Sequence, residues 1–153
     1  MLESLTVRDA CAADLPTFAR FWISMFEEIG MFAERDFAGG WDEPFVEYFE
    51  NRIARGEACL SVAVDGERVV ATAGALESDG YPAIIHGVKL GYVFGVRVEP
   101  EFRRMGLARA LTQRSVEFLR ARGCKRIRLH ASDAGRTIYE SLGFRASNEM
   151  VLR

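Results

Sequence analysis

One segment of the chain reads Tyr92-Val-Phe-Gly-Val-Arg-Val-Glu-Pro-Glu-Phe-Arg-Arg-Met-Gly-Leu-Ala-Arg-Ala-Leu111. It combines an apolar strand, a proline, a basic loop with a glycine, and the start of an amphipathic helix. The first turn of a helix leaves backbone N–H groups unpaired, and these groups attract anions. Small residues at Gly106 and Ala108 let an anion approach the backbone. Positive charge beside them comes from Arg103, Arg104 and Arg109. The segment therefore predicts a phosphate-binding loop.

The spacing of this loop, Arg103-x-x-Gly106-x-Ala108, differs from the common nucleotide loops. A Walker loop ends in Gly-Lys-Ser/Thr, and a dinucleotide fingerprint has three glycines. The loop instead resembles the coenzyme A pyrophosphate loop of the GCN5-related N-acetyltransferase (GNAT) family, R/Q-x-x-G-x-G/A. In that family the loop follows a strand that ends in Val-x-Pro, which Val98-Glu99-Pro100 matches. An ordinary strand-to-helix turn with scattered arginines is the alternative for the loop taken alone.

The C-terminal third carries a second motif in the matching order. Residues 126–131 predict a strand, and residues 134–142 predict a short helix that Gly143 ends. The GNAT family has a strand, a helix with a tyrosine and a Gly-Phe pair at this place, and Tyr139-Glu-Ser-Leu-Gly-Phe144 is similar to it. The resemblance runs from about residue 92 to the end, and the N-terminal part agrees only in its order of elements.

The remaining patterns complete the predicted fold. They indicate strands over residues 5–8, 60–64 and 68–76, a helix with Asp14 as its N-cap, a helix over residues 43–55 and a last strand over residues 145–153. This order is that of an α/β (α+β) domain. The resemblance implies a GNAT-like acyl-CoA N-acyltransferase fold, with a twisted mixed sheet of about six or seven strands, about four flanking helices and splayed central parallel strands. A single domain over residues 1–153 is expected.

Composition narrows the class of protein. We find no apolar run of membrane-spanning length and no signal-peptide pattern, so we expect a cytoplasmic protein that does not bind membranes. Cys11, Cys59 and Cys124 form no C-x-x-C pair, so we expect neither a disulfide framework nor a metal site.

Charge is divided unevenly along the chain. Residues 1–80 carry 6 basic and 16 acidic side chains, whereas residues 81–153 carry 14 and 6. A polyphosphate would be attracted to the basic half, and a cationic amine to the acidic half. A folded chain can interleave its two halves, so this charge asymmetry supports a polyphosphate and a cationic amine as ligands without establishing either.

The resemblance implies acetyl-CoA as co-substrate. Its pantetheine arm would hydrogen-bond the strand over residues 91–98 as another strand would, with a bulge at Gly95. The cofactor-binding residues so implied are Val96, Arg97, Val98, Arg103, Arg104, Met105, Gly106, Leu107, Ala108, Arg109, Ser132 and Arg136. Ser132 stands where the family commonly has asparagine, and Gly135 where it commonly has alanine. Arg136 either approaches the adenosine phosphate or solvates its helix.

The implied chemistry is attack of a neutral amine on a thioester in a ternary complex. Tyr139 matches the family's general acid, which protonates the departing sulfur; a core tyrosine is the alternative. We assign no general base, and the conceivable residues are His130, Glu77, Glu47, Tyr92 and His86. Trp22, Trp41 and Phe37 either line an acceptor pocket or pack in the core.

The resemblance therefore implies an N-acetyltransferase that acts on a small-molecule or peptide amine, and the acidic N-terminal half favours a cationic one. A non-catalytic acyl-CoA sensor is the main alternative. Nucleic-acid binding through the arginines of residues 114–128 is a third reading, which we do not adopt because acidic and apolar residues interrupt them and the pI is about 5.8. A homodimer through the C-terminal strand is plausible.

Overall fold

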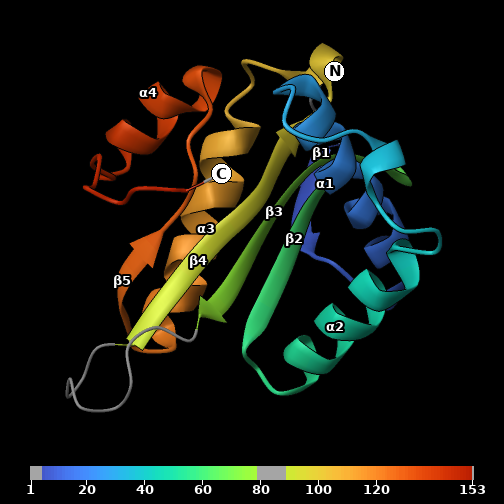
Figure 1. Ribbon diagram of the computed structural model, residues 1–153, viewed down its shortest axis with the longest axis horizontal. Helices are drawn as coiled ribbons and strands as arrows, with labels where there is room; N and C mark the ends of the chain where they lie inside the picture. Colours follow the sequence, from blue (N-terminus) through green and yellow to red (C-terminus); the bar gives the residue numbers. More distant parts are fainter. Residues whose placement is uncertain (1–4, 79–88, 153) are drawn as a thin grey trace.

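A mixed sheet forms the centre of the computed structural model, which describes residues 5–78 and 89–152. In these ranges the strand order is β1-β2-β3-β4-β5 (Figure 1). Strands β1 to β4 are antiparallel neighbours, whereas β4 and β5 are parallel. The strands are β1 (Leu5–Asp9), β2 (Ala58–Asp65), β3 (Arg68–Ser78), β4 (Lys89–Val98) and β5 (Cys124–Arg128).

Helices cover both faces of the sheet. Helices α1 and α2 pack on one face and α3 packs on the other, while α4 follows β5 (Figure 1). The helices are α1 (Leu15–Glu28), α2 (Asp42–Ala54), α3 (Leu107–Ala121) and α4 (Asp133–Ser141). Short 3-10 turns are η1 (Ala12–Asp14), η2 (Glu34–Asp36) and η3 (Pro100–Phe102).

The alternation of side chains along β2 explains the two layers. Leu60 and Val62 join the core under α1 and α2, whereas the neighbouring Ala63 joins the core under α3. Successive side chains of a strand point to opposite faces, so one strand contributes to both cores. The mixed α/β architecture is confirmed, and so is the predicted order of helices and strands as far as α4.

Strands β4 and β5 separate partway along their length. Their pairing runs from Lys89 to Tyr92 on β4, after which β4 continues to Val98 without a β5 partner among the described residues. Gly95 has φ +61°, and a Cβ there would lie 2.9 Å from the Phe18 ring. The Thr72 hydroxyl donates to the Gly95 carbonyl at 2.8 Å, where the β3–β4 register shifts. The predicted bulge and the predicted splaying are both present.

The last predicted strand is wrong. Within residues 145–152 the structure contains no strand, and Met150, Val151 and Leu152 are exposed. The described sheet therefore has five strands, fewer than the six or seven expected. The segment begins with a run of small and polar residues that has no apolar face to bury, so strand pairing gains little there.

Asp14 precedes α1 as expected, but its side chain does not cap that helix. Its carboxylate instead accepts from the Cys11 N–H at 2.8 Å and from Arg8 Nη1 at 2.6 Å. Hydrogen bonding from Arg8 lowers the pKa of the Asp14 carboxyl to about 2. The carboxylate therefore ties β1 to the turn before α1.

We expect Asp14→Asn to lower the free energy of unfolding by about 1–3 kcal/mol at neutral pH, because hydrogen bonds to a charged group are lost. The pKa of Asp14 is depressed in the folded state, so its contribution is present above its usual value of 3.8 and is lost as pH falls toward 2. Urea unfolding across this pH range measures the effect. Asp36→Asn is the control, because Asp36 makes the same contact with a backbone N–H, that of Ala33, on an exposed turn. Equal losses of unfolding free energy in both variants would contradict the stabilising role that we assign to the Asp14 carboxylate.

Candidate functional site

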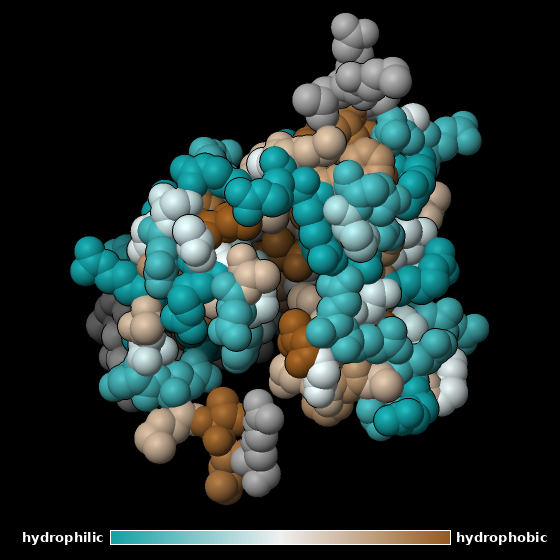
Figure 2. All heavy atoms as spheres, turned by 90° about the horizontal axis from the view of Figure 1, so that it is seen from above, coloured by the Kyte–Doolittle hydropathy of each residue, from teal (hydrophilic) through white to brown (hydrophobic). Residues whose placement is uncertain are grey.

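A cleft of about 1030 Å³ lies where β4 leaves β5. Its walls come from the end of β4, the loop before α3, the first turn of α3, the end of α1 and helix α4. Figure 2 looks onto this end of the molecule and shows a hollow whose floor is hydrophobic and whose surroundings are largely hydrophilic. The cleft thus combines an apolar interior with a polar entrance.

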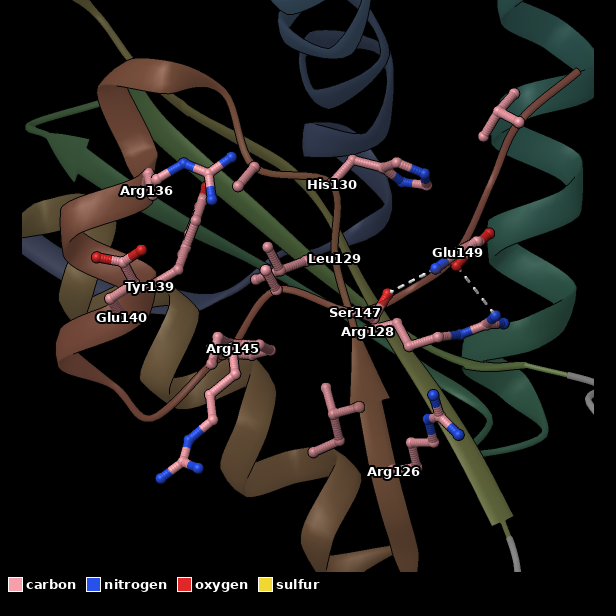
Figure 3. Close-up of a pocket in the computed structure, with 15 residues that line it drawn as sticks. Arg126, Arg128, Leu129, His130, Arg136, Tyr139, Glu140, Arg145, Ser147 and Glu149 are labelled. Atoms are coloured by element: carbon pink, nitrogen blue, oxygen red, sulfur yellow. Dashed lines mark hydrogen bonds and ion pairs between the residues drawn. The ribbon is translucent and has the colours of Figure 1, made fainter.

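The structure brings most of the sequence-predicted site residues to this one cleft. Those that line it are Val96, Arg97, Val98, Arg103, Arg104, Gly106, Leu107, Ala108, Arg109, Ser132 and Tyr139. Two do not line it. Met105 is on the same loop with 48% of its surface exposed, and Arg136 lines a different cavity on α4 (Figure 3).

The loop has the geometry of an anion site. Gly106 is the N-cap residue of α3 and has φ +79°, which is a backbone conformation that favours glycine. A Cβ at this position would meet no other atom within 4 Å, so the space in front of the glycine is open. The following N–H groups belong to the first helical turn, which has no intrahelical acceptors for them. A phosphate group fits this combination of space, donors and helix dipole.

Glu28 at the end of α1 forms ion pairs with two arginines of the cleft. Arg103 Nη2 donates to Glu28 Oε1 at 2.9 Å, and Arg103 Nε donates to the Val98 carbonyl at 3.0 Å. Arg97 also contacts Glu28, at 3.2 Å, and its guanidinium lies 5.0 Å from the centre of the Phe21 ring. Sequence reasoning missed Glu28, because 69 residues separate it from Arg97 and no local motif contains it.

Tyr139 on α4 lies at the meeting point of three cavities, since it lines each of them. Its side chain packs edge-on against Phe144, with the ring centres 6.2 Å apart. A Cβ on Gly135 would lie 2.7 Å from Tyr139 Cε2, so glycine at this position makes room for the ring. Burial raises the pKa of the Tyr139 hydroxyl above 10, and the group is therefore protonated at neutral pH.

A second cavity, of about 740 Å³, adjoins the cleft. We call it the aromatic cavity, because its lining includes Trp22, Phe26, Trp41, Phe45, Tyr48, Phe49, Tyr92 and Phe94. Of the three aromatic residues considered from the sequence, Trp22 and Trp41 line this cavity. Phe37 does not; its ring lies behind theirs, 6.3 Å from Trp22 and 5.8 Å from Trp41.

Two of the conceivable bases lie together in the aromatic cavity. The Tyr92 hydroxyl and His130 Nδ1 are 2.5 Å apart, and both residues line the cavity. Glu77 is instead held by Lys89 and Arg122, and neither it nor Glu47 lines the cavities. His86 lies outside the described residues.

The third cavity, of about 400 Å³, lies between β5, α4 and the C-terminal segment (Figure 3). Its charged lining consists of Arg126, Arg128, Arg136, Glu140, Arg145 and Glu149. Arg128 Nη1 lies 3.7 Å from Glu149 Oε2, and this ion pair partly neutralises the charge of Arg128. Figure 3 shows His130 and Tyr139 on different elements, the first on the segment after β5 and the second on α4.

Two features are absent from residues 5–78 and 89–152. None of the helices there is long and apolar enough to cross a membrane. No group of three or more His, Cys, Asp or Glu side chains in the same residues is placed to hold a metal ion.

Comparison with known proteins identifies relatives of one kind. The model of the acetyltransferase (GNAT) family matches residues 24–144. A glucosamine 6-phosphate N-acetyltransferase of Trypanosoma brucei brucei is 38% identical over 60 residues, which are 39% of this chain and 41% of that protein. A mycothiol acetyltransferase of Thermobispora bispora is 43% identical over 58 residues, 36% of this chain and 20% of that protein. The match spans less than half the length of these curated relatives.

Solved structures extend the similarity to nearly the whole chain. A GCN5-related N-acetyltransferase from Ralstonia eutropha is 26% identical with a TM-score of 0.82, and 97% of each chain is covered. A predicted acetyltransferase from Clostridium acetobutylicum, solved with acetyl-CoA, has a TM-score of 0.83 at 23% identity, covering 97% of this chain and 95% of that one. The second likeness concerns the fold alone.

Proposed function

The chain belongs to the acetyltransferase (GNAT) family, and on this basis we propose that it is an acetyl-CoA-dependent N-acetyltransferase. It moves the acetyl group from the thioester to a primary amine by direct attack in a ternary complex. The observation that carries the proposal is that Tyr139, Val96 and Ser132 line both the cleft and the aromatic cavity. Two substrates that enter from these two sides meet at Tyr139.

The cleft fits acetyl-CoA in both shape and charge. The open space at Gly106 and the first N–H groups of α3 would hold the pyrophosphate, with Arg103, Arg104 and Arg109 beside it. The unpaired edge of β4 from Val96 would hydrogen-bond the pantetheine arm. The Val98 carbonyl already accepts from Arg103, so it has one lone pair left for this purpose.

The residues near Tyr139 match the needs of the reaction. The amine nitrogen forms a bond to the thioester carbon, the C–S bond breaks, and the sulfur must receive a proton. Tyr139, protonated at neutral pH, donates that proton and regains one from solvent. A backbone N–H at the bulge near Val96 supplies the donor for the oxygen that becomes negative.

Glu28 opposes part of this binding, since its carboxylate lies beside the arginines that would meet the pyrophosphate. We expect Glu28→Gln to tighten acetyl-CoA binding by about twofold to fivefold, because an exposed ion pair is worth about 0.2–1 kcal/mol. Calorimetric titration at low and high salt measures this, and the gain should shrink as salt rises. Glu27→Gln is the control, because Glu27 does not line the cleft. Weaker binding in Glu28→Gln would show instead that Glu28 positions the arginines.

The function is tested by calorimetric titration with acetyl-CoA, followed by measurement of free-thiol release with a panel of primary amines. Micromolar binding and amine-dependent thiol release are expected. Binding without thiol release for any amine would favour the acyl-CoA sensor, and absence of binding would overturn the proposal. Binding to a nucleic-acid duplex that weakens as the salt concentration rises would instead support nucleic-acid binding. Two of the arginines that such binding would use, Arg114 and Arg122, are already paired with Asp9 and Glu77.

A further inference from the structure

We propose that the aromatic cavity binds the acceptor, and that the acceptor is an arylalkylamine: a primary amine joined by a short alkyl linker to a flat aromatic group. The aromatic group packs among the rings of the cavity, and the amine lies at the end formed by Tyr92, His130 and Tyr139. This inference rests on the proposed function, because it names the acceptor of that reaction.

The rings of the cavity form a continuous apolar lining. Trp22 and Phe45 have ring centres 5.4 Å apart, and Phe45 and Phe49 are 4.7 Å apart. Phe49 stacks on Phe94 at 5.0 Å, and the Phe94 ring is parallel to that of Tyr92. Aromatic side chains of this kind gain most by packing against another flat apolar group. A chain of rings that leads from α1 to the reacting end favours an aromatic ligand.

Glycine holds one of these rings in place. A Cβ on Gly74 would lie 2.4 Å from Phe94 Cζ, so the ring of Phe94 rests directly on the backbone of β3. A larger residue at 74 would push the ring into the cavity. The cavity is therefore a built feature of the sheet rather than a gap left by loose packing.

The cavity lacks the charges that a sugar phosphate or a polyamine would need. Among its lining residues in the part of the chain that the structure describes, we find no Asp, Glu, Lys or Arg. A buried phosphate or a second ammonium group would lose its hydration without gaining an ion pair. Two acidic residues of the N-terminal half are engaged elsewhere, Asp14 with Arg8 and Glu28 with Arg97.

The polar groups lie where the amine must react. The Tyr92 hydroxyl, His130, Ser132 and the Tyr139 hydroxyl all belong to the cavity lining. Transfer into the apolar cavity lowers the pKa of an alkylammonium group, which favours the neutral nucleophile. The ammonium ion loses two protons in the whole reaction. One passes through the hydrogen-bonded Tyr92–His130 pair to solvent before the attack. The other leaves the nitrogen for solvent after the C–N bond forms, and Tyr139 regains from solvent the proton that it gives to the sulfur.

The first test compares acceptors by thiol release at saturating acetyl-CoA. We expect kcat/KM for 2-phenylethylamine and tryptamine to exceed that for glucosamine 6-phosphate, glucosamine and spermidine by about 100-fold or more, because a polar amine leaves the apolar lining poorly packed and its own groups unpaired. Fastest turnover of a sugar amine or of spermidine would overturn the inference and leave the proposed function standing.

The second test does not depend on turnover. The chain contains two tryptophans, Trp22 and Trp41, and both line the cavity. Titration of 2-phenylethylamine into the protein with bound CoA should therefore change tryptophan emission to saturation, whereas glucosamine should leave it unchanged. Unchanged emission with both amines would overturn the inference. A saturating change with 2-phenylethylamine but no thiol release would support the ligand class and count against the transfer reaction.

Two variants test whether the acceptor binds in the aromatic cavity. Trp41 is the residue just before α2, so Trp41→Ser removes the ring without altering the interior of the helix. We expect it to raise KM for 2-phenylethylamine by about tenfold or more and to leave acetyl-CoA affinity unchanged. Phe118→Leu is the matched control, because this half-buried ring on α3 lies outside the three cavities. Equal effects in both variants would contradict the placement of the acceptor, and loss of acetyl-CoA binding by all forms would contradict the proposed function instead.

Discussion

Replacing Gly106 by glutamate is expected to weaken acetyl-CoA binding by about 100-fold or more. Gly106 has φ +79°, and the space before its missing Cβ is open, so the new side chain would enter the site of the pyrophosphate. Two charges about 4 Å apart repel by about 4 kcal/mol at an effective dielectric constant of about 20, which exceeds the roughly 2.7 kcal/mol of a 100-fold change. Calorimetric titration with acetyl-CoA measures the loss.

Gly123→Glu separates this effect from backbone strain. Gly123 lies just after the other end of α3, with φ +86° and no atom within 4 Å of a Cβ, so the same substitution imposes a similar conformational strain. It does not line the cleft. We expect near-normal acetyl-CoA affinity in this variant. Unchanged affinity in Gly106→Glu would reject the loop as the phosphate site.

Replacing Tyr139 by phenylalanine is expected to lower kcat by about 100-fold while acetyl-CoA affinity stays unchanged. The ring and its contact with Phe144 remain, and only the hydroxyl that would protonate the sulfur is removed. Thiol release and calorimetric titration on the same preparation measure the two quantities. Full activity would leave Tyr139 as a structural residue, and a parallel loss of affinity would show that the hydroxyl contributes to binding.

The pH dependence of the unmodified enzyme gives an independent check on Tyr139. Burial raises the pKa of its hydroxyl above the usual value of 10, so the hydroxyl stays protonated through neutral and mildly alkaline pH. We therefore expect no decline of kcat from ionisation of Tyr139 below about pH 10. A decline near neutral pH that disappears in Tyr139→Phe would contradict the burial of the hydroxyl.

Local patterns in the sequence predicted the parts of the site that are continuous in the chain. The loop from Arg103 to Ala108 and the helix that carries Tyr139 are each specified by a few neighbouring residues, and the structure places both on one cleft. The bulge at Gly95 was predictable for the same reason, since glycine permits the φ of +61° that it adopts. The strand predicted over residues 145–153 is wrong, because pairing of an edge strand depends on a partner that the local sequence does not describe.

Contacts between distant segments could not be predicted in this way. Glu28 meets Arg97 and Arg103 only after α1 packs beside β4. The hydrogen bond between Tyr92 and His130 joins positions 38 residues apart on β4 and after β5. Aromatic residues at helical spacing predict a buried face, but not whether that face is filled or left as a cavity.

The sequence by itself determined the family, the order of most elements, the glycine loop before α3 and the place of Tyr139 on its helix, because each depends on residues that are close together in the chain. Only the tertiary structure decided that the cleft and the aromatic cavity meet at Tyr139, that Glu28 pairs with Arg97 and Arg103, and that Arg136 lies in another cavity. The physical reason is that a cavity is the volume left between packed elements. Its shape and charge follow from the crossing of helices and strands and from the divergence of β4 and β5, which no single segment encodes.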